Sequence, residues 1–275
     1  MAATREVLPQ MRSKAAARSD AACPCPVCGT GCRPLDRVDL NKSCEETKGR
    51  VLPPSGILVE YVFCEGCGFC FAPVLCLWTL DEFSERIYNE QYEFVDPDYV
   101  VARPTGNAAD LVRWFGERGS AMAHLDYGGG HGLLSDFLRD SGWNSRSYDP
   151  YFDRSTPVAN LGKFDLITAY EVFEHVPDVN TLGSDLVTLL NPEGVVIFST
   201  VLSDGFITAG MPLTWWYAAP RNGHISLFSR KSLELLATEF GFNFGSYAPG
   251  LHAFWRKLPP WAASSMPPPT GQEMS

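Results

Sequence analysis

His124-Leu-Asp-Tyr-Gly-Gly-Gly-His-Gly-Leu-Leu-Ser-Asp-Phe-Leu138 is the stretch that decides the fold. It begins as a short apolar strand pattern ending at Asp126 and continues as an amphipathic helix pattern from Leu133. The glycines between them let the backbone turn sharply and approach a ligand closely. Their spacing, G-x-G-x-G after an acidic residue, differs from the G-x-G-x-x-G dinucleotide fingerprint, although a glycine loop alone leaves that kind of site open.

Helix and strand patterns alternate on both sides of this loop, from about residue 105 to 257, which predicts an α/β sheet. Thr105 is expected to cap the first helix and Ser229 the last, with Gly241 just past its end. The remaining patterns predict helices at 133–141 and 179–190, strands at 122–127, 145–148, 164–170 and 194–200, and a closing hairpin of 243–247 with 251–256.

The chain divides by composition into five segments. Residues 1–22 are small and polar and predict a disordered extension. Residues 23–77 are rich in cysteine, and 78–104 read as a linker with a helix around 80–88. Residues 105–258 carry the α/β pattern, and the Pro-rich residues 259–275 are expected to form an irregular surface tail.

The composition excludes some classes of protein. Hydrophobic residues make up 45% and charged residues 20% of 275, so a core of ordinary size is possible. No apolar run reaches about 18 residues, and the start lacks an apolar signal region. The expected location is therefore cytoplasmic, with a transit peptide as the open alternative. A net charge of −10 argues against a nucleic-acid binder.

All nine cysteines fall in the first 76 residues. In a protein that is not exported, clustered cysteines bind metal more often than they form disulfides. Two C-x-x-C-G knuckles can supply the tetrahedral sulphur set that Zn²⁺ prefers, and four sulphurs leave no open position for chemistry. Cys23 and Cys70 are the alternative zinc ligands if one of the knuckles binds the ion in a shifted register. The predicted structural zinc ligands are Cys25, Cys28, Cys64 and Cys67.

An acidic residue also ends the strand that follows the glycine loop. Asp149 lies in Ser147-Tyr-Asp-Pro150, and a carboxylate at this point of an α/β sheet can accept both ribose hydroxyls of a nucleoside. The next strand runs into Phe164-Asp-Leu-Ile-Thr-Ala-Tyr-Glu-Val-Phe-Glu-His-Val176.

In their order and spacing these motifs resemble those of class I S-adenosylmethionine-dependent methyltransferases, over residues 105–256. The resemblance implies a Rossmann-like sheet of seven strands with an antiparallel last strand. It also implies that Gly128 and Gly130 pass under the methionine moiety and that Asp149 holds the ribose, with Asp126 and Glu171 at the same cofactor. Only 15 residues separate Asp149 from Asp165, so the third strand of the family and its helix hardly fit. The adenine is expected at 159–161.

A cluster of acidic residues and histidine follows the strand at 164–170. Ligands of open α/β sheets sit beyond such carboxyl ends, and on a helical turn Glu171, Glu174 and His175 can face one point. A second histidine, His224, precedes the Ser229 helix. Glu171, Glu174, His175 and His224 are the candidate catalytic residues.

This E-x-x-E-H pattern with a later histidine resembles ubiquinone-pathway O-methyltransferases and small-RNA 2′-O-methyltransferases, which implies a divalent cation that activates a hydroxyl. It also resembles zinc-bearing sugar C-methyltransferases, in which a cysteine module precedes the methyltransferase fold and a histidine is the general base. Both mechanisms stay open at this point, so a catalytic divalent metal is a possible second ion.

Three adjacent aromatic residues lie in the long connection before His224. They suit a lid or an acceptor wall. The predicted acceptor residues are Trp215, Trp216, Tyr217 and Arg221. The resemblance thus implies methyl transfer from S-adenosylmethionine to a small molecule. The alternatives are an RNA methyltransferase whose zinc ribbon contacts RNA, and a non-catalytic module that binds the cofactor and a partner.

Overall fold

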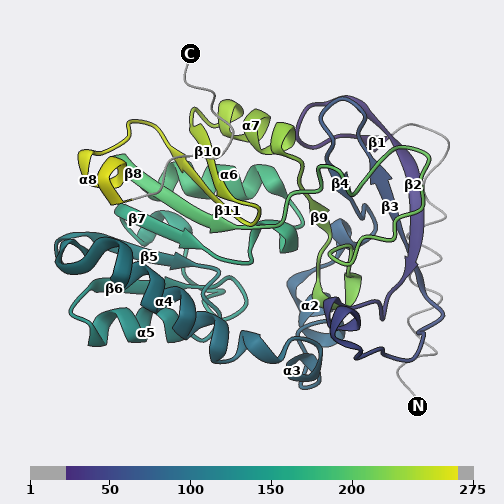
Figure 1. Ribbon diagram of the computed structural model, residues 1–275, viewed down its shortest axis with the longest axis horizontal. Coiled ribbons are helices and arrows are strands. Elements are labelled where there is room, and N and C mark those ends of the chain that lie inside the picture. Colours follow the sequence, from purple (N-terminus) through teal and green to yellow (C-terminus); the bar gives the residue numbers. More distant parts are fainter. Residues whose placement is uncertain (1–22, 266–275) are drawn as a thin grey trace.

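The computed structural model describes residues 23–265, which form two sheets that share one body (Figure 1). The predicted extension at 1–22 and the end of the tail at 266–275 lie outside the described residues. Among the described residues, no helix combines the length and the apolar character that a membrane span requires.

The larger sheet has six strands in the order β10-β11-β8-β7-β5-β6. The four central and edge strands β8, β7, β5 and β6 run parallel, and β10 and β11 form an antiparallel hairpin on the β8 edge. The strands are β5 (Ala123–Tyr127), β6 (Asn144–Tyr148), β7 (Phe164–Ala169), β8 (Leu190–Ser199), β10 (Asn243–Ala248) and β11 (Leu251–Trp255).

The α/β fold class and the antiparallel closing hairpin are confirmed, but the sheet has six strands in the described chain and not seven. The residues between β6 and β7 hold only a short 3-10 helix, η5 (Val158–Asn160). Fifteen residues are too few for a strand and a returning helix, because a parallel crossover needs a dozen or more residues besides its strand.

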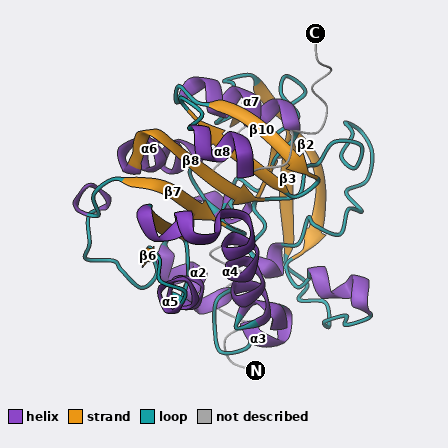
Figure 2. Cartoon of the chain, turned by 60° about the vertical axis from the view of Figure 1, so that its left-hand side comes forward, coloured by secondary structure: helices purple, strands orange, loops and turns teal. Residues whose placement is uncertain are grey.

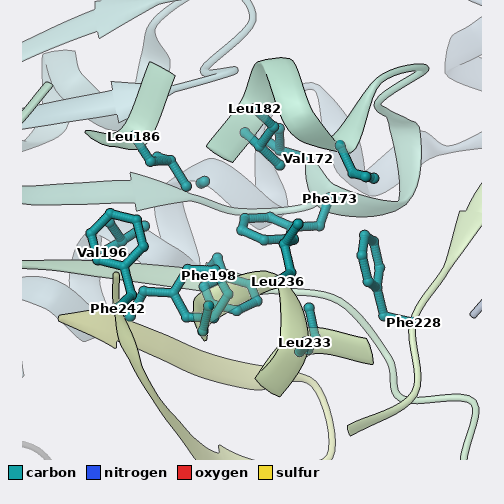
Figure 3. Close-up of a cluster of buried hydrophobic side chains, with 14 of the residues drawn as sticks. Val172, Phe173, Leu182, Leu186, Val196, Phe198, Phe228, Leu233, Leu236 and Phe242 are labelled. Carbon is teal, nitrogen blue, oxygen red and sulfur yellow. The ribbon is translucent and has the colours of Figure 1, made fainter. Parts of the chain in front are cut away.

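The helices cover both faces of this sheet (Figure 2). Val195 and Ile197 of β8 share a buried cluster with α4, α5 and α8, while Val196 and Phe198 pack with α6 and α7 on the other face (Figure 3). This follows from the strand period of two. The helices are α4 (Ala102–Phe115), α5 (Leu133–Asp140), α6 (Val179–Leu189), α7 (Arg230–Glu239) and α8 (Pro260–Ser265).

Two predictions about helices are wrong. Thr105 is not an N-cap: α4 begins at Ala102, and the Thr105 hydroxyl donates to the carbonyl of Val101 inside the first turn. The tail is not wholly irregular, since α8 buries Ala262 completely and sets Trp261 against Phe115 with ring centroids 5.6 Å apart. Burial of these apolar groups outweighs the local preference of a Pro-rich segment. The Ser229 cap is confirmed.

The smaller sheet belongs mostly to residues 23–77, called here the cysteine module. Its antiparallel order is β1-β2-β3-β4-β9, so its last strand comes from the far end of the chain (Figure 1). The strands are β1 (Cys23–Pro24), β2 (Gly31–Asp39), β3 (Leu58–Phe63), β4 (Cys70–Phe71) and β9 (Ser226–Leu227).

The linker between module and larger sheet is folded. The predicted helix at 80–88 is present as α2 (Leu80–Arg86), with Thr79 accepting a hydrogen bond from the amide of Glu82 as its N-cap. A short helix α3 (Tyr92–Val95) and a 3-10 turn follow. Together they carry the chain across the carboxyl ends of β5, β6 and β7, where they form one wall of the candidate site.

Candidate functional site

A cavity of about 540 Å³ lies at the carboxyl ends of the parallel strands. Four segments line it: the linker and the start of α4 (within 80–107), the glycine loop (within 126–134), the turn after β6 (149–152) and the segment after β7 (170–177). This is the edge at which open α/β sheets bind their ligands.

The glycine loop forms the floor of the cavity, and its shape excludes side chains. Gly128 has φ +73°, and a Cβ there would lie 2.5 Å from the side chain of Val172. A Cβ on Gly129 would lie 2.3 Å from Asp126 Oδ2 and 2.4 Å from Ser147 Oγ. Gly130 has φ +55° with open space in front of it, where the nearest atom is 3.8 Å away on Tyr99. The loop therefore presents bare backbone to the cavity.

Asp149 and Asp126 stand on either side of the loop. Asp149 is buried, and its two carboxylate oxygens accept hydrogen bonds from the amides of Gly130, at 3.0 Å, and Tyr151, at 2.8 Å. A carboxylate offers about four acceptor positions, so capacity for two hydroxyl donors remains. Burial raises the pKa of Asp126 to about 7, while the hydroxyl of Thr168 donates to it at 2.8 Å.

Glu171 occupies a strained position directly after β7. It is the one described non-glycine residue with positive φ, at 54°. Its amide donates to Ser199 Oγ at 2.7 Å, and that hydroxyl donates to Glu171 Oε1 at 2.8 Å. Strain of this kind persists only where neighbours enforce it, and it gathers at functional sites. Glu171 lines the cavity.

Three of the four predicted catalytic residues come together. Glu174, His175 and His224 place donor atoms within 4.8 Å of one another, and the two imidazole rings are 4.9 Å apart. Glu171 does not belong to this group of three. His175 lines the cavity, whereas Glu174 and His224 lie behind it.

Burial sets the charge of this cluster. It lowers the pKa of His175 to about 4 and that of His224 well below the ordinary imidazole value, so both rings are neutral at pH 7. Burial, aided by the charge of Glu171, raises the pKa of Glu174 well above its usual range. The hydroxyl of Tyr217 donates to Glu174.

The four predicted acceptor residues do not line this cavity. Tyr217 is buried against Glu174, and Trp215 stacks on Phe206. Trp216 is 40% exposed. Arg221 is buried and donates to the carbonyl of Ile87 at 2.8 Å. The residues predicted for the adenine, 159–161, are also absent from the lining, which has Tyr151 and Phe152 on that side.

Most of the other lining residues were not anticipated from the sequence, among them Tyr88, Tyr99 and Arg103. Tyr88, two residues after α2, places its hydroxyl 3.1 Å from His175 Nδ1 and packs edge-on against Tyr151. Tyr99 lies over Gly130. Arg103 forms a bidentate pair with Asp96 at 2.8 and 2.9 Å. The abundance of tyrosine in the linker is the sequence feature that could have indicated these residues. The linker has no periodicity from which its path across the sheet could be predicted.

The predicted zinc ligands are also brought together. Cys25, Cys28, Cys64 and Cys67 place their sulphurs within 4.8 Å of one another, and two of these contacts, Cys25–Cys67 and Cys28–Cys64, measure 3.6 and 3.4 Å. A tetrahedral zinc with bonds of about 2.3 Å separates its sulphurs by roughly 3.8 Å, so the four thiols fit this ion.

The two knuckles repeat one backbone geometry. Gly29 donates its amide to the carbonyl of Cys25, and Gly68 donates to that of Cys64, at 2.9 and 2.7 Å. Both glycines have positive φ, at +73° and +78°. Each knuckle thus turns its two sulphurs to the same side, as metal-binding knuckles do.

Comparison with known proteins gives partial matches. The ubiquinone biosynthesis O-methyltransferase of Actinobacillus pleuropneumoniae serotype 7 is 29% identical over 28% of this chain and 44% of its own length. The protein of the same name from Colwellia psychrerythraea is 29% identical over 29% of this chain and 42% of its own. The chain thus spans less than half the length of these curated relatives.

Comparison with solved structures gives matches of low similarity. An O-methyltransferase family protein from Burkholderia thailandensis is 14% identical over 64% of this chain and 63% of its own, with a TM-score of 0.44. Human N-acetylserotonin methyltransferase in complex with SAM is 14% identical over 63% of this chain and 60% of its own, with a TM-score of 0.43.

A family model described as a methyltransferase domain matches residues 80–246, which is more than half of the chain. The protein therefore belongs to the methyltransferase domain family.

Proposed function

We propose that the protein transfers a methyl group from S-adenosylmethionine to a hydroxyl or an activated carbon of a small molecule. The proposal rests on one observation: a single cavity is lined by the bare glycine loop, by the carboxylate of Asp149, which could accept the ribose hydroxyls, and by the neutral imidazole of His175. Methyl transfer needs its donor, its acceptor and a proton acceptor in one enclosed space.

The donor half of the cavity fits S-adenosylmethionine, which supplies an electrophilic methyl group on a sulphonium. Asp149 has acceptor capacity left for two ribose hydroxyls. Gly128 and Gly130 leave room for the methionine part, while Tyr151 and Phe152 line the side on which the adenine would lie.

His175 is the proposed general base. Because it faces the cavity and is neutral, it can take the proton that an acceptor hydroxyl or carbon loses as the acceptor binds the methyl group. Tyr88, hydrogen-bonded to its Nδ1, holds the orientation of the ring. His224 packs on the side away from the cavity.

The acceptor is proposed to be a small molecule because the cavity has a volume of about 540 Å³ and an acidic lining. Among the described residues that line the cavity, Arg103 is the one Arg or Lys, and it is paired with Asp96. An RNA backbone binds through contacts of its phosphates with several Lys or Arg side chains, and this lining does not supply them. The acidic lining residues are Glu90, Glu93, Asp96, Asp126, Asp149 and Glu171.

A metal-assisted variant of the same reaction is supported by one observation, the clustering of Glu174, His175 and His224 within 4.8 Å. Two imidazoles and a carboxylate suit a divalent transition metal with open positions. In the module, Cys25, Cys28, Cys64 and Cys67 are proposed to hold a separate structural Zn²⁺.

The test combines binding with turnover. Calorimetry should detect S-adenosylmethionine binding to the wild-type protein. Formation of S-adenosylhomocysteine with a panel of phenols, catechols and polyhydroxyl compounds should identify acceptors. His175→Asn should retain cofactor affinity and lose about 10²–10⁴ in rate, the usual size of general-base catalysis. Inhibition by a chelator that leaves the module zinc in place would favour the metal-assisted variant. No binding of S-adenosylmethionine would refute the proposal.

A further inference from the structure

The segment that carries His224 lies between the cysteine module and the Glu174 turn. On one side the amide of Ile225 donates to the carbonyl of Glu174 at 2.8 Å. On the other side the amide of Ala72 donates to the carbonyl of Ile225 at 2.9 Å, and β9 pairs with β4. The module is therefore in backbone contact with the candidate catalytic cluster through Ile225 and the adjoining β9.

Tyr61 adds a side-chain contact from the module to the same segment. It lies in β3 and is completely buried. Its hydroxyl donates to the carbonyl oxygen of His224 at 2.7 Å. Burial raises the pKa of Tyr61 well above the usual phenol value, so the hydroxyl keeps its proton and remains a donor.

The ring of His224 is held at a second point. Its Nδ1 lies 2.8 Å from the carbonyl oxygen of Tyr217. A carbonyl can only accept, so Nδ1 carries the hydrogen of the neutral ring and Nε2 is the free acceptor. With the backbone held by Tyr61 and the ring by Tyr217, the imidazole of His224 packs edge-to-face with that of His175, with ring centroids 4.9 Å apart.

We propose that Tyr61 is a positioning residue for the transfer reaction: from the cysteine module, it fixes His224 and thereby the orientation of the His175–His224 pair. The inference rests on the proposed function, in which His175 receives the proton. A base must sit within hydrogen-bond reach of the proton, so a small displacement of its neighbour lowers the rate without weakening cofactor binding.

The test is Tyr61→Phe, which keeps the buried ring and removes only the hydroxyl. With the acceptor found in the panel, catechol being the first probe, kcat should fall about tenfold, the effect of losing roughly 1.4 kcal/mol of stabilisation. The KM for S-adenosylmethionine and the zinc content should stay at the wild-type values. Tyr247→Phe, in β10 at the edge of the larger sheet, is the matched control and should leave kcat unchanged.

Two further measurements do not need turnover. In Tyr61→Phe, the imidazole NMR signals of His224 should shift, and the Ile225 amide should exchange faster with solvent, while amides of β5 and β7 keep their rates. Unchanged His224 signals and unchanged Ile225 exchange would overturn the inference. Loss of zinc with faster exchange throughout the chain would overturn it too, because Tyr61 would then be a general stability residue. A wild-type protein that turns over no acceptor contradicts the proposed function, while these two measurements still decide the role of Tyr61.

Discussion

The charge of one imidazole decides whether the cavity holds a proton acceptor. His175 is half-buried, packs against Tyr88 and His224, and has its pKa lowered to about 4 by its removal from water. The folded protein therefore binds fewer protons here than the unfolded chain between pH 6.5 and 4. The contribution of His175 to stability is present at pH 7 and is lost as the pH falls through this window.

We expect the His175 imidazole to titrate near pH 4. If His175 is the base, its protonation should therefore not lower kcat at any pH above about 5.5. The ¹³Cε1 shift of His175, assigned by comparison with His175→Asn, measures the titration directly. A midpoint near 6.5 would mean that the ring is hydrated and would contradict the buried geometry.

Asp149 allows a second test at the scale of one side chain. Asp149→Asn should weaken S-adenosylmethionine binding by about ten- to a hundredfold, because one charged acceptor of hydroxyl donors becomes a neutral amide. Asp136→Asn, an exposed acid on α5, is the matched control and should bind as the wild type does. Equal affinities of the two variants in calorimetry would place the cofactor elsewhere.

At the scale of single residues, the sequence predicts those members of the candidate site that belong to local motifs. Gly128 and Asp149 are predictable because each directly follows a recognisable strand, and His175 because it lies in the turn a few residues after β7; the strands of one parallel sheet end at one edge. Tyr88 and Arg103 are not, because they belong to the linker, whose path over the sheet depends on packing rather than on periodicity. Whether these residues act as proposed stays a prediction.

Among the elements, the two cysteine knuckles provide a natural matched pair. Gly29 and Gly68 have nearly the same backbone conformation, but their surroundings differ. A Cβ on Gly29 would meet nothing within 4 Å, whereas one on Gly68 would lie 2.8 Å from Ser229 Oγ. Ser229 caps α7 and donates to the carbonyl of Cys67 at 2.5 Å, so this knuckle is tied directly to a helix cap. The first knuckle contacts the larger domain through the carbonyl of Pro26, which accepts a hydrogen bond from Asn180 of α6 at 3.3 Å.

Gly29→Ala should cost about 1–2 kcal/mol, the ordinary cost of the left-handed region for an L-residue. Gly68→Ala should cost roughly 1–3 kcal/mol more, since it also displaces the cap of α7. Urea unfolding of both variants measures the difference. Equal costs would show that the knuckle and α7 are not coupled.

Prediction at the element scale worked where turns and periodicity agree. The helix predicted at 133–141 is confirmed as α5, and the hairpin as β10 and β11. It failed at Thr105, because α4 begins at Ala102 without a capping side chain, where Arg103 of its first turn pairs with Asp96. It also failed for the number of strands, although the short interval between Asp149 and Asp165 already indicated the missing one.

Across the whole molecule, the cysteine module shares its core with the methyltransferase part. Phe69 of the module packs on Phe228 with ring centroids 4.9 Å apart, inside the cluster that also holds α6 and α7. Tyr61 shares a second buried cluster with Trp215 and Ile225. No local pattern in the sequence predicts that β9, more than 150 residues after β4, completes the sheet of the module.

A shared core predicts one cooperative transition. If the module were an independent domain, calorimetry would resolve two transitions, because separate cores unfold separately. We expect a single transition for the zinc-loaded chain, with equal calorimetric and van't Hoff enthalpies. Two resolved transitions would contradict the continuity of the buried clusters.

The same continuity determines how the molecule responds to removal of the metal. Four thiols without their ion lose the bonds that hold both knuckles, and one knuckle supports the cap of α7. A loss of about 3 kcal/mol would lower the Tm by roughly 10 °C in a chain of this size. Chelation should therefore shift the whole transition, and added Zn²⁺ should restore it.

The double variant Cys64→Ser, Cys67→Ser should melt at the lower temperature even without chelator. Cys76→Ser, a cysteine outside the four-sulphur group, is the control and should retain one zinc per chain and the wild-type response to chelator. A chelator that lowers only the protection of residues 23–77, and leaves the amides of α7 and β9 as they were, would show that the metal supports the module alone.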